Sequence, residues 1–426
     1  MELAILIGVL LILMALGVPV AFALLGSAIA TFIALDFPLQ VVFHRMAAGM
    51  SLFTLMAIPF FIFAGDLMYR AGIADRLVRV ADACFGRSRG GLGQVTVGAS
   101  MMFGAVSGSA IASASAMGSA LGPLMKEQGY DGDYAVNVTS TAAIVGLLIP
   151  PSHNMIVYAA SAGKGVSVGD LFLAGIVPGV LTGILLMVVA WLVAVKRGYP
   201  KGKFPGWEQF TRAFVWAIPG LMTAIIIMGG ILSGMFTPTE SSAIAVIYTI
   251  AIGLFVYRSL DLKTFLECAQ QSVRVTAMIM MIVAAASAFG YAVAILEAPT
   301  HLANMITSLT SHPIGVLLIV NLLLLILGTF MDMSPLIVIT TPIFLPLVMA
   351  AGVDPTHFGI IMMINLGIGL VTPPVGAVLF VGSAVGKVPI EKTIKTIWPF
   401  YLALVIALLF ITFVPALSMT LPNMLG

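Results

Sequence analysis

Long runs of apolar residues, separated by short polar segments, dominate the chain. A helix that crosses a bilayer needs about 20 apolar residues, and most of the runs approach or exceed this length. The spans predicted from them cover residues 3–35, 50–69, 134–160, 170–195, 213–235, 241–257, 275–296, 358–386 and 397–418. The pattern therefore predicts an all-α, multi-pass membrane protein with about nine full spans.

Two further apolar regions, 93–125 and 313–350, do not fit single spans. Each is long enough for two short helices, and each is interrupted by small or polar residues, at 106–109 and at 331–335. The Lys and Arg clusters fall on one side of the membrane only if both regions return to the side they enter. We predict two re-entrant helical hairpins, although pairs of very short crossings satisfy the same rule. The N-terminus is then cytoplasmic and the C-terminus lies on the far side.

Composition narrows the class of protein. Hydrophobic residues make up 61% of the chain and charged residues 8%, against roughly 45–50% and about 25% in soluble domains. These values exclude an ordinary soluble protein and make membrane lipid the expected surroundings, and a net charge of +2 argues against a nucleic-acid partner. The sequence has no P-loop, H-E-x-x-H or G-x-S-x-G motif, and its five histidines and two cysteines do not suggest a transition-metal centre. We expect no enzymatic activity.

The chain resembles itself when it is shifted by 223 residues. The matched pairs are Ser109 and Asp332, Asp131 and Asp354, Gly146 and Gly369, Pro150 and Pro373, and Pro151 and Pro374. Chance similarity within an apolar chain is the alternative. Because the two predicted hairpins open to opposite faces, we predict two inverted repeats, an organisation typical of secondary transporters.

The repeat sets the predicted domain boundaries. Residues 1–196 form the first repeat, with scaffold helices in 1–86 and a hairpin and broken helix in 90–165. Residues 197–212 form a cytoplasmic loop. Residues 213–426 form the second repeat, with scaffold helices in 213–262 and a hairpin and broken helix in 313–386.

Each repeat contains a Pro-Pro pair inside an apolar segment, at 146–154 and at 369–376. Proline lacks a backbone donor and clashes with the preceding turn, so each pair is expected to end one helix and begin another. The freed carbonyls are tolerated at membrane depth only when they are buried in protein or line a wet cavity. We predict that they coordinate a small hard cation; a kink satisfied by water or by Ser and Thr hydroxyls is the alternative.

The hairpin tips and the broken segments supply the candidate cation ligands. They are Ser107, Gly108, Ser109, Gly146 and Ile149 in the first half, and Thr329, Met331, Asp332, Met333, Gly369 and Thr372 in the second. Small-residue helix packing is the alternative for the first tip. Asp332 is an isolated acid at membrane depth, where a charge costs about 2.5–3.5 kcal/mol. It is a candidate to bind a cation, to orient the tip or to contact a substrate.

The helix starts that follow the Pro-Pro pairs suit an anionic substrate group such as a carboxylate, because a helix N-terminus carries partial positive charge. The candidate substrate contacts are Ser109, Ser152, His153, Asn154 and Asp332. For His153, a hydrogen bond within the broken segment is the alternative.

These residues resemble those of the large membrane subunit of TRAP (tripartite ATP-independent periplasmic) transporters over nearly the whole chain. The resemblance rests on residues 17–24 (GVPVAFAL), 58–65 (IPFFIFAG), 90–92 (GGL), 103–110 (FGAVSGSA), 149–152 (IPPS), 236–240 (FTPTE), 328–332 (GTFMD) and 369–376 (GLVTPPVG). Together these segments are specific for the family, although each of them alone would be weak evidence. His153 and Asn154 depart from the pattern, since many relatives have a more apolar residue after Pro-Pro-Ser.

The resemblance implies an elevator-type transport domain, similar to the ion-transporter superfamily, that holds both hairpins and moves against a scaffold. It implies uptake of an organic acid of the sialic acid or C4-dicarboxylate class, with overall likeness favouring sialic acid, in a bacterial inner membrane. Na⁺ is the implied coupling ion, with two or more sites and no organic cofactor. The implied partners are a small four-helix membrane subunit, separate from this chain, and a periplasmic substrate-binding protein.

The expected mechanism places one sodium between residues 107–109 and 146–150, and a second between 329–333 and 369–372. Ions and substrate then favour the same arrangement, so each raises the affinity for the other. The alternatives are a stand-alone sodium–dicarboxylate symporter, an ion antiporter or a channel, none of which needs a soluble binding protein. A membrane enzyme lacks a nucleophile–base pair here, and a purely structural protein leaves Asp332 unexplained.

Overall fold

The computed structural model describes residues 2–163, 165–202, 206–310 and 312–425. Apart from one isolated β-bridge between Arg89 and Lys201, the described residues form helices, turns and loops. The helices of the first half are α1 (Glu2–Ala15), α2 (Val20–Ala34), α3 (Gln40–Met50), η1 (Phe53–Met56), α4 (Ala57–Arg70), α5 (Ile73–Phe85), α6 (Gly91–Ser107), α7 (Ala110–Glu127), α8 (Gly132–Leu148), α9 (His153–Ala162) and α10 (Val168–Lys196). The all-α prediction is confirmed.

The helices of the second half are α11 (Trp207–Leu232), α12 (Pro238–Ala251), η2 (Ile252–Val256), α13 (Leu262–Ile295), α14 (Ala298–Leu309), α15 (Pro313–Gly328), α16 (Met333–Ala350), α17 (Pro355–Gly369), α18 (Ala377–Gly386), α19 (Ile390–Thr396), α20 (Trp398–Phe413) and α21 (Ala416–Leu425). The predicted cytoplasmic loop 197–212 includes residues 203–205, which lie outside the described residues, and α11 begins within its last third.

The number of helices suited to crossing a membrane is smaller than predicted. By length and apolar composition, six described helices qualify, or eight if the bent pairs α8–α9 and α19–α20 each count as one span. The predicted single span 3–35 is wrong. It is divided into α1 and α2, which pack against each other. Gly17 takes a left-handed conformation (φ +79°) and Pro19 starts α2, so the chain reverses there.

Both interrupted apolar regions form pairs of packed helices joined by a short tip. α6 and α7 are joined by tip 1, residues 107–109, and α15 and α16 by tip 2, residues 329–332. Both broken segments also separate two helices: break 1, residues 149–152, lies between α8 and α9, and break 2, residues 370–376, between α17 and α18. Each break contains one cis Pro-Pro bond.

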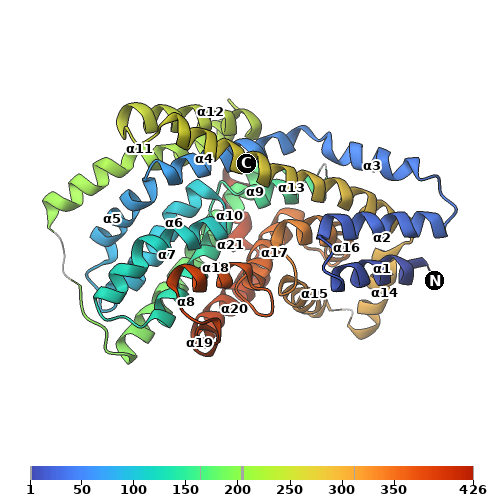
Figure 1. Cartoon of the computed structure of the whole chain (residues 1–426). Coiled ribbons are helices and arrows are strands. Elements are labelled where there is room, and N and C mark those ends of the chain that lie inside the picture. The colour runs from blue at the N-terminus through green and yellow to red at the C-terminus, as the bar shows by residue number, and fades with distance from the viewer. Residues whose placement is uncertain (1, 164, 203–205, 311, 426) are drawn as a thin grey trace.

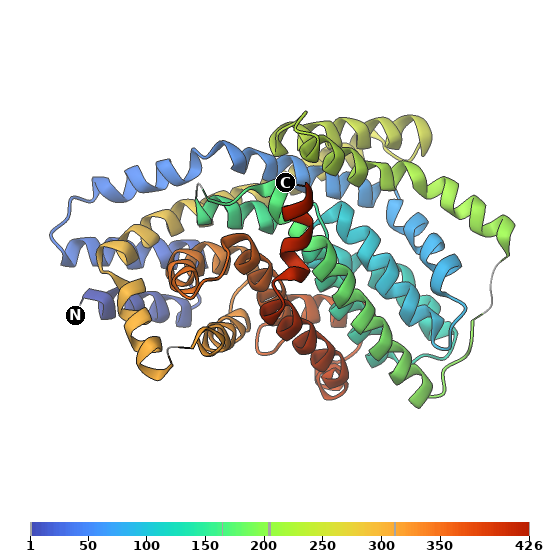
Figure 2. The same cartoon turned by 180° about the vertical axis from the view of Figure 1, so that it is seen from behind.

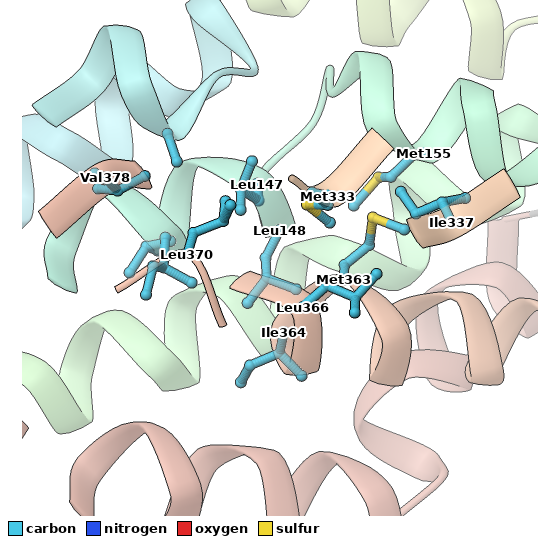
Figure 3. Packing of buried hydrophobic residues seen from close by; sticks show 14 of the residues in the cluster. Leu147, Leu148, Met155, Met333, Ile337, Met363, Ile364, Leu366, Leu370 and Val378 are labelled. Carbon is cyan, nitrogen blue, oxygen red and sulfur yellow. The ribbon is translucent and has the colours of Figure 1, made fainter. Parts of the chain in front are cut away.

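Helices from the two halves interleave around the breaks. In Figures 1 and 2, α5–α8 lie toward one end of the molecule, α1, α2 and α14–α16 toward the other, and α17–α20 between them. α9 packs against α16, and α18 packs against α7 and α8. Figure 3 shows the apolar core at this junction, where Leu147 and Leu148 of α8 and Met155 of α9 lie near Met333 and Met363. The two breaks are therefore embedded in one shared core.

Candidate functional site

Tip 1 is placed directly on break 1. Gly108 ends α6 in a left-handed conformation (φ +59°), and Ser109 begins α7 by accepting a hydrogen bond from the Ala112 N–H at 3.3 Å. A Cβ atom on Gly108 would lie 2.8 Å from the carbonyl oxygen of Pro151. Both the backbone conformation and this close approach require glycine. Ser107 and Ser109, two predicted ligands, are therefore held half-buried beside break 1.

Near tip 1, α6 and α8 cross at a pair of glycines, and this crossing fixes the position of the tip. Gly104 of α6 faces Gly146 of α8, and a Cβ atom on Gly146 would come within 2.9 Å of the Gly104 Cα. Only two glycines allow the helix backbones to approach this closely. Gly146 was predicted as a ligand; Gly104 was missed, although it lies in the same small-residue segment as the tip.

Break 1 leaves backbone acceptors without donors. In a continuous helix, the carbonyls of Gly146 and Leu147 would accept from residues 150 and 151, which are prolines. Within the described residues no hydrogen bond reaches these two carbonyls, and the buried Ser152 hydroxyl has no partner. Ile149 is half-buried and its N–H donates to the Val145 carbonyl at 3.1 Å. Unpaired buried oxygens of this kind fit a small hard cation.

Tip 2 contacts break 2 through the backbone. The Thr329 carbonyl accepts a hydrogen bond from the Val375 N–H at 3.1 Å, and the Thr329 hydroxyl donates to the Ile326 carbonyl at 2.8 Å. Below the tip, Gly328 of α15 crosses Gly369 of α17, where a Cβ atom on Gly369 would lie 2.5 Å from the Gly328 carbonyl oxygen. In each half, a pair of glycines thus allows the hairpin to pack closely against the broken helix.

Three successive carbonyls at the start of break 2, those of residues 369–371, have donors from the chain itself. The Gly369 carbonyl accepts from the Thr372 N–H at 2.9 Å, and the Leu370 carbonyl accepts from the Val378 N–H at 3.0 Å. The Val371 carbonyl accepts from the Tyr401 hydroxyl at 2.5 Å. Tyr401 was missed; its signal was a phenol inside the apolar run 397–418.

The remaining predicted ligands of the second half lie in and beside tip 2. Asp332 is exposed, and its carboxylate accepts from the Met333 N–H at 2.9 Å, which makes it the N-cap of α16. Met331 and Met333 are buried on either side of it. Thr372 is half-buried and its hydroxyl donates to the Ile368 carbonyl at 2.7 Å. The structure therefore gives Asp332 a tip-orienting contact while leaving carboxylate oxygen accessible.

One side-chain hydrogen bond connects break 1 with tip 2. The Ser334 hydroxyl, in the first turn of α16, donates to the Asn154 side-chain oxygen in the first turn of α9 at 2.9 Å, and both residues are buried. His153, beside Asn154, is half-buried, and its side chain has no hydrogen bond within the described residues. The first turns of α9 and α16 thus meet, which brings four predicted substrate contacts to one junction: Ser152, His153, Asn154 and Asp332. Ser109 reaches the same junction through tip 1 and break 1, whereas no hydrogen bond of the described residues joins the two tips directly.

The end of α8 remote from break 1 is anchored by charge. The Arg197 guanidinium pairs with Asp131 at 3.0 Å and with Asp133 at 2.9 Å, and the Tyr199 hydroxyl donates to Asp131 at 2.7 Å. Burial, and then the hydrogen bond to Asp131, raise the pKa of Tyr199 to about 12, so the phenol stays protonated and donating at neutral pH. These contacts hold the start of α8 against the end of α10.

Four cavities of about 170–770 Å³ are lined by other residues and include none of the predicted site residues.

Comparisons of the sequence with known proteins lead to one family of transporters. A family model described as tripartite ATP-independent periplasmic transporter, DctM component, matches residues 7–417. The chain is 44% identical over 377 residues to the C4-dicarboxylate TRAP transporter large permease protein of Pseudomonas aeruginosa, which covers 88% of this chain and 87% of the relative. It is 37% identical over 416 residues to the sialic acid TRAP transporter large permease protein of Vibrio cholerae, which covers 96% and 95%. These relatives are named as permeases, not as enzymes.

A solved structure shares the fold. The YdaH transporter of Alcanivorax borkumensis aligns with a TM-score of 0.62 and 16% identity, covering 89% of this chain and 90% of that chain. At this identity the likeness concerns the arrangement of helices alone.

Proposed function

This chain belongs to the DctM-component family of tripartite ATP-independent periplasmic transporters, and we propose that it is a large membrane subunit that takes up an organic acid together with sodium. The substrate class is a carboxylate such as sialic acid or a C4-dicarboxylate, because relatives at 37% and 44% identity are named for these acids. Family membership over residues 7–417 carries this conclusion.

The transporter works with two partners in this proposal. The family is tripartite by name, so a small four-helix membrane subunit and a periplasmic substrate-binding protein complete the assembly. The chain lies in a bacterial inner membrane with its N-terminus in the cytoplasm and its C-terminus in the periplasm. The support for this orientation is the clustering of Lys and Arg residues.

The first sodium binds where tip 1 meets break 1. The unpaired carbonyls of Gly146 and Leu147 and the unpaired Ser152 hydroxyl support this site, and the tip adds Ser107 and Ser109. The second sodium binds where tip 2 meets break 2. Because the Gly369 and Leu370 carbonyls there already accept hydrogen bonds, the accessible carboxylate of Asp332 is the main negative ligand of the second site.

The acid binds at the junction of α9 and α16. The N-terminal turns of these helices carry partial positive charge, and Ser109, Ser152, His153 and Asn154 offer hydrogen-bonding groups. Sodium ions order the two tips and complete this pocket, so ions and substrate favour the same arrangement. The loaded domain, which holds both hairpins and the two inverted repeats' broken helices, then moves across the membrane as an elevator.

Uptake in proteoliposomes tests the proposal. The chain is reconstituted with its small subunit, the binding protein is added with a labelled acid, and an inward sodium gradient is applied. Uptake should depend on both the gradient and the binding protein. Full-rate uptake with potassium in place of sodium would contradict the sodium coupling, and full-rate uptake without the binding protein would favour a stand-alone symporter.

A further inference from the structure

A cavity of about 770 Å³ lies between α5 and α11, far from the tips and breaks in the fold. The two helices pack side by side in both views of Figures 1 and 2. One wall is the polar side of α5, which carries Arg76 and Arg79, and the other is a face of α11 with Arg212 and Trp216. The proposed transport mechanism uses none of these residues.

The cavity lies where candidate membrane spans begin and end. Arg70, which lines it, is the last residue of one candidate span, and Arg212 lies in the second turn of another. Ser259, also in its lining, stands between the end of the candidate span Pro238–Val256 and the start of Leu262–Ile295. The ends of four candidate spans therefore meet around one cavity, a position that suits a lipid headgroup.

α5 is an amphipathic helix. Ile73, Leu77 and Val80 are buried against the protein, whereas Asp75, Arg79 and other polar residues of the opposite side face the cavity. A helix with one buried apolar side and one charged side packs on the protein by its apolar side and leaves its charges accessible. α5 is also the only link between α4 and α6 in the chain, so it connects the first hairpin to the helices before it.

The charges that line the cavity are unbalanced. Four arginines, Arg70, Arg76, Arg79 and Arg212, face two aspartates, Asp75 and Asp82.

Two of the four arginines already have partners. Arg76 donates to the carbonyls of Ala71 and Gly72 and lies 3.7 Å from the centre of the Tyr257 ring. Arg70 pairs with Glu267 at 3.2 Å.

The other two arginines that line the cavity are Arg79 and Arg212. Both side chains are exposed, and neither has an ion pair or hydrogen bond within the described residues. An arginine presents a planar fork of donors that matches the oxygens of a phosphate. Trp216, half exposed beside them, has the amphipathic ring that is enriched at the headgroup level of membranes.

We infer that this cavity binds the phosphate headgroup of an anionic phospholipid, held by Arg79 of α5 and Arg212 of α11. Basic pockets between membrane helices on the cytoplasmic side are suited to such headgroups. The bound lipid ties α5 to α11 and so steadies the link that leads to the first hairpin. The inference needs the membrane location of the chain and does not depend on which acid it transports.

Thermal unfolding of the purified full chain tests the site. Micelles that contain phosphatidylglycerol should raise the unfolding midpoint of the wild type by about 2–4 °C, whereas phosphatidylcholine micelles and millimolar inorganic phosphate should not. The double variant Arg79→Gln/Arg212→Gln should lose this rise. A matched pair outside the cavity, Arg87→Gln/Lys263→Gln, removes the same charge and should keep it.

Two outcomes of this experiment overturn the inference. An equal rise with inorganic phosphate alone would assign the site to free phosphate, and an equal loss in the control pair would reduce the effect to general charge attraction.

Fluorescence quenching gives a second test that does not need the arginine variants to fold. Phosphatidylglycerol with brominated acyl chains should quench the tryptophan emission of the wild type more than brominated phosphatidylcholine does. Trp216→Phe should remove that difference, because Trp216 lines the cavity. Equal quenching by the two lipids in the wild type contradicts the site.

Discussion

Break 1 and break 2 share a sequence pattern and differ in their hydrogen bonds. In each, a Pro-Pro pair removes the donors that two carbonyls would have had in a continuous helix. In break 2, the Thr372 and Val378 N–H groups replace those donors for Gly369 and Leu370. In break 1, the matching carbonyls of Gly146 and Leu147 accept no hydrogen bond within the described residues. In this conformation the two carbonyls that lose their donors to the Pro-Pro pair are unpaired at break 1 and paired at break 2.

Two segments with the same Pro-Pro motif therefore need not be equally prepared to bind a cation. A cation at the Gly146 and Leu147 carbonyls breaks no hydrogen bond, whereas a cation at the Gly369 and Leu370 carbonyls must displace existing donors. The N-terminal ends of the two broken helices also differ in their hydrogen bonds. Asp354 caps α17 by accepting from the Thr356 and His357 N–H groups, whereas Asp131, its counterpart at α8, pairs with Arg197.

The two halves are most alike at the glycine crossings. Substitutions there should reduce stability and uptake more than any of the variants described below. Gly104→Ala and Gly369→Ala each place a methyl group against the backbone of the facing helix, which should cost about 1–3 kcal/mol of stability by overpacking and abolish most uptake. Gly122→Ala, where a Cβ atom meets nothing within 4 Å, is the matched control. Thermal unfolding and proteoliposome uptake measure both effects, and normal uptake by Gly104→Ala would contradict the tight crossing.

Asp332→Asn separates charge from capping at tip 2. Asparagine caps helices as well as aspartate does, so the contact with the Met333 N–H should persist and the unfolding midpoint should hardly change. Uptake should fall by at least about tenfold, or about 1.4 kcal/mol, because the proposed second sodium loses its negative ligand. Asp354→Asn, at another N-cap, removes the same charge away from the site and should leave uptake intact. Wild-type uptake by Asp332→Asn would assign the residue to capping alone.

Ser152→Ala tests the unpaired oxygens of break 1. The buried hydroxyl has no hydrogen-bond partner, so its removal should leave stability unchanged or slightly higher. The sodium concentration for half-maximal uptake should rise by about threefold to tenfold, since losing one ligand costs up to about 1.4 kcal/mol. Thr372→Val provides the comparison at break 2, because the Thr372 hydroxyl is already bonded to Ile368. Equal sodium dependence in wild type and Ser152→Ala would exclude Ser152 as a ligand.

Tyr401→Phe should give break 2 an unpaired carbonyl, as break 1 has. Its effect on stability and uptake should be smaller than that of the other variants. It frees the Val371 carbonyl and should lower stability by about 0.6 kcal/mol, the average for a side-chain hydrogen bond in a membrane protein. Half-maximal sodium should fall slightly, because a carbonyl becomes available. Tyr158→Phe loses a similar bond, to the Pro355 carbonyl at 2.6 Å, and should lower stability without altering sodium dependence. If both variants alter it alike, Tyr401 has no particular role at break 2.

The all-helical membrane class, the approximate positions of the two tips and the positions of the breaks could be predicted from the sequence, although Met333, Ser334 and Pro335, predicted in tip 2, belong to α16. These features are local: apolar run length sets a helix that suits a bilayer, and Pro150-Pro151 and Pro373-Pro374 name the carbonyls that lose their donors. Local pattern failed at residues 3–35, where an apolar run hid the reversal at Gly17.

The contacts between segments far apart in the sequence followed from the tertiary structure alone. Tyr401 reaches Val371 across 30 residues and Ser334 reaches Asn154 across 180, and Gly104 meets Gly146 through the crossing of two helices. A proline fixes which donor is absent from its own turn, but it does not determine which distant helix packs alongside. That packing depends on shape and contact among distant residues, which no local pattern of apolar and polar positions specifies.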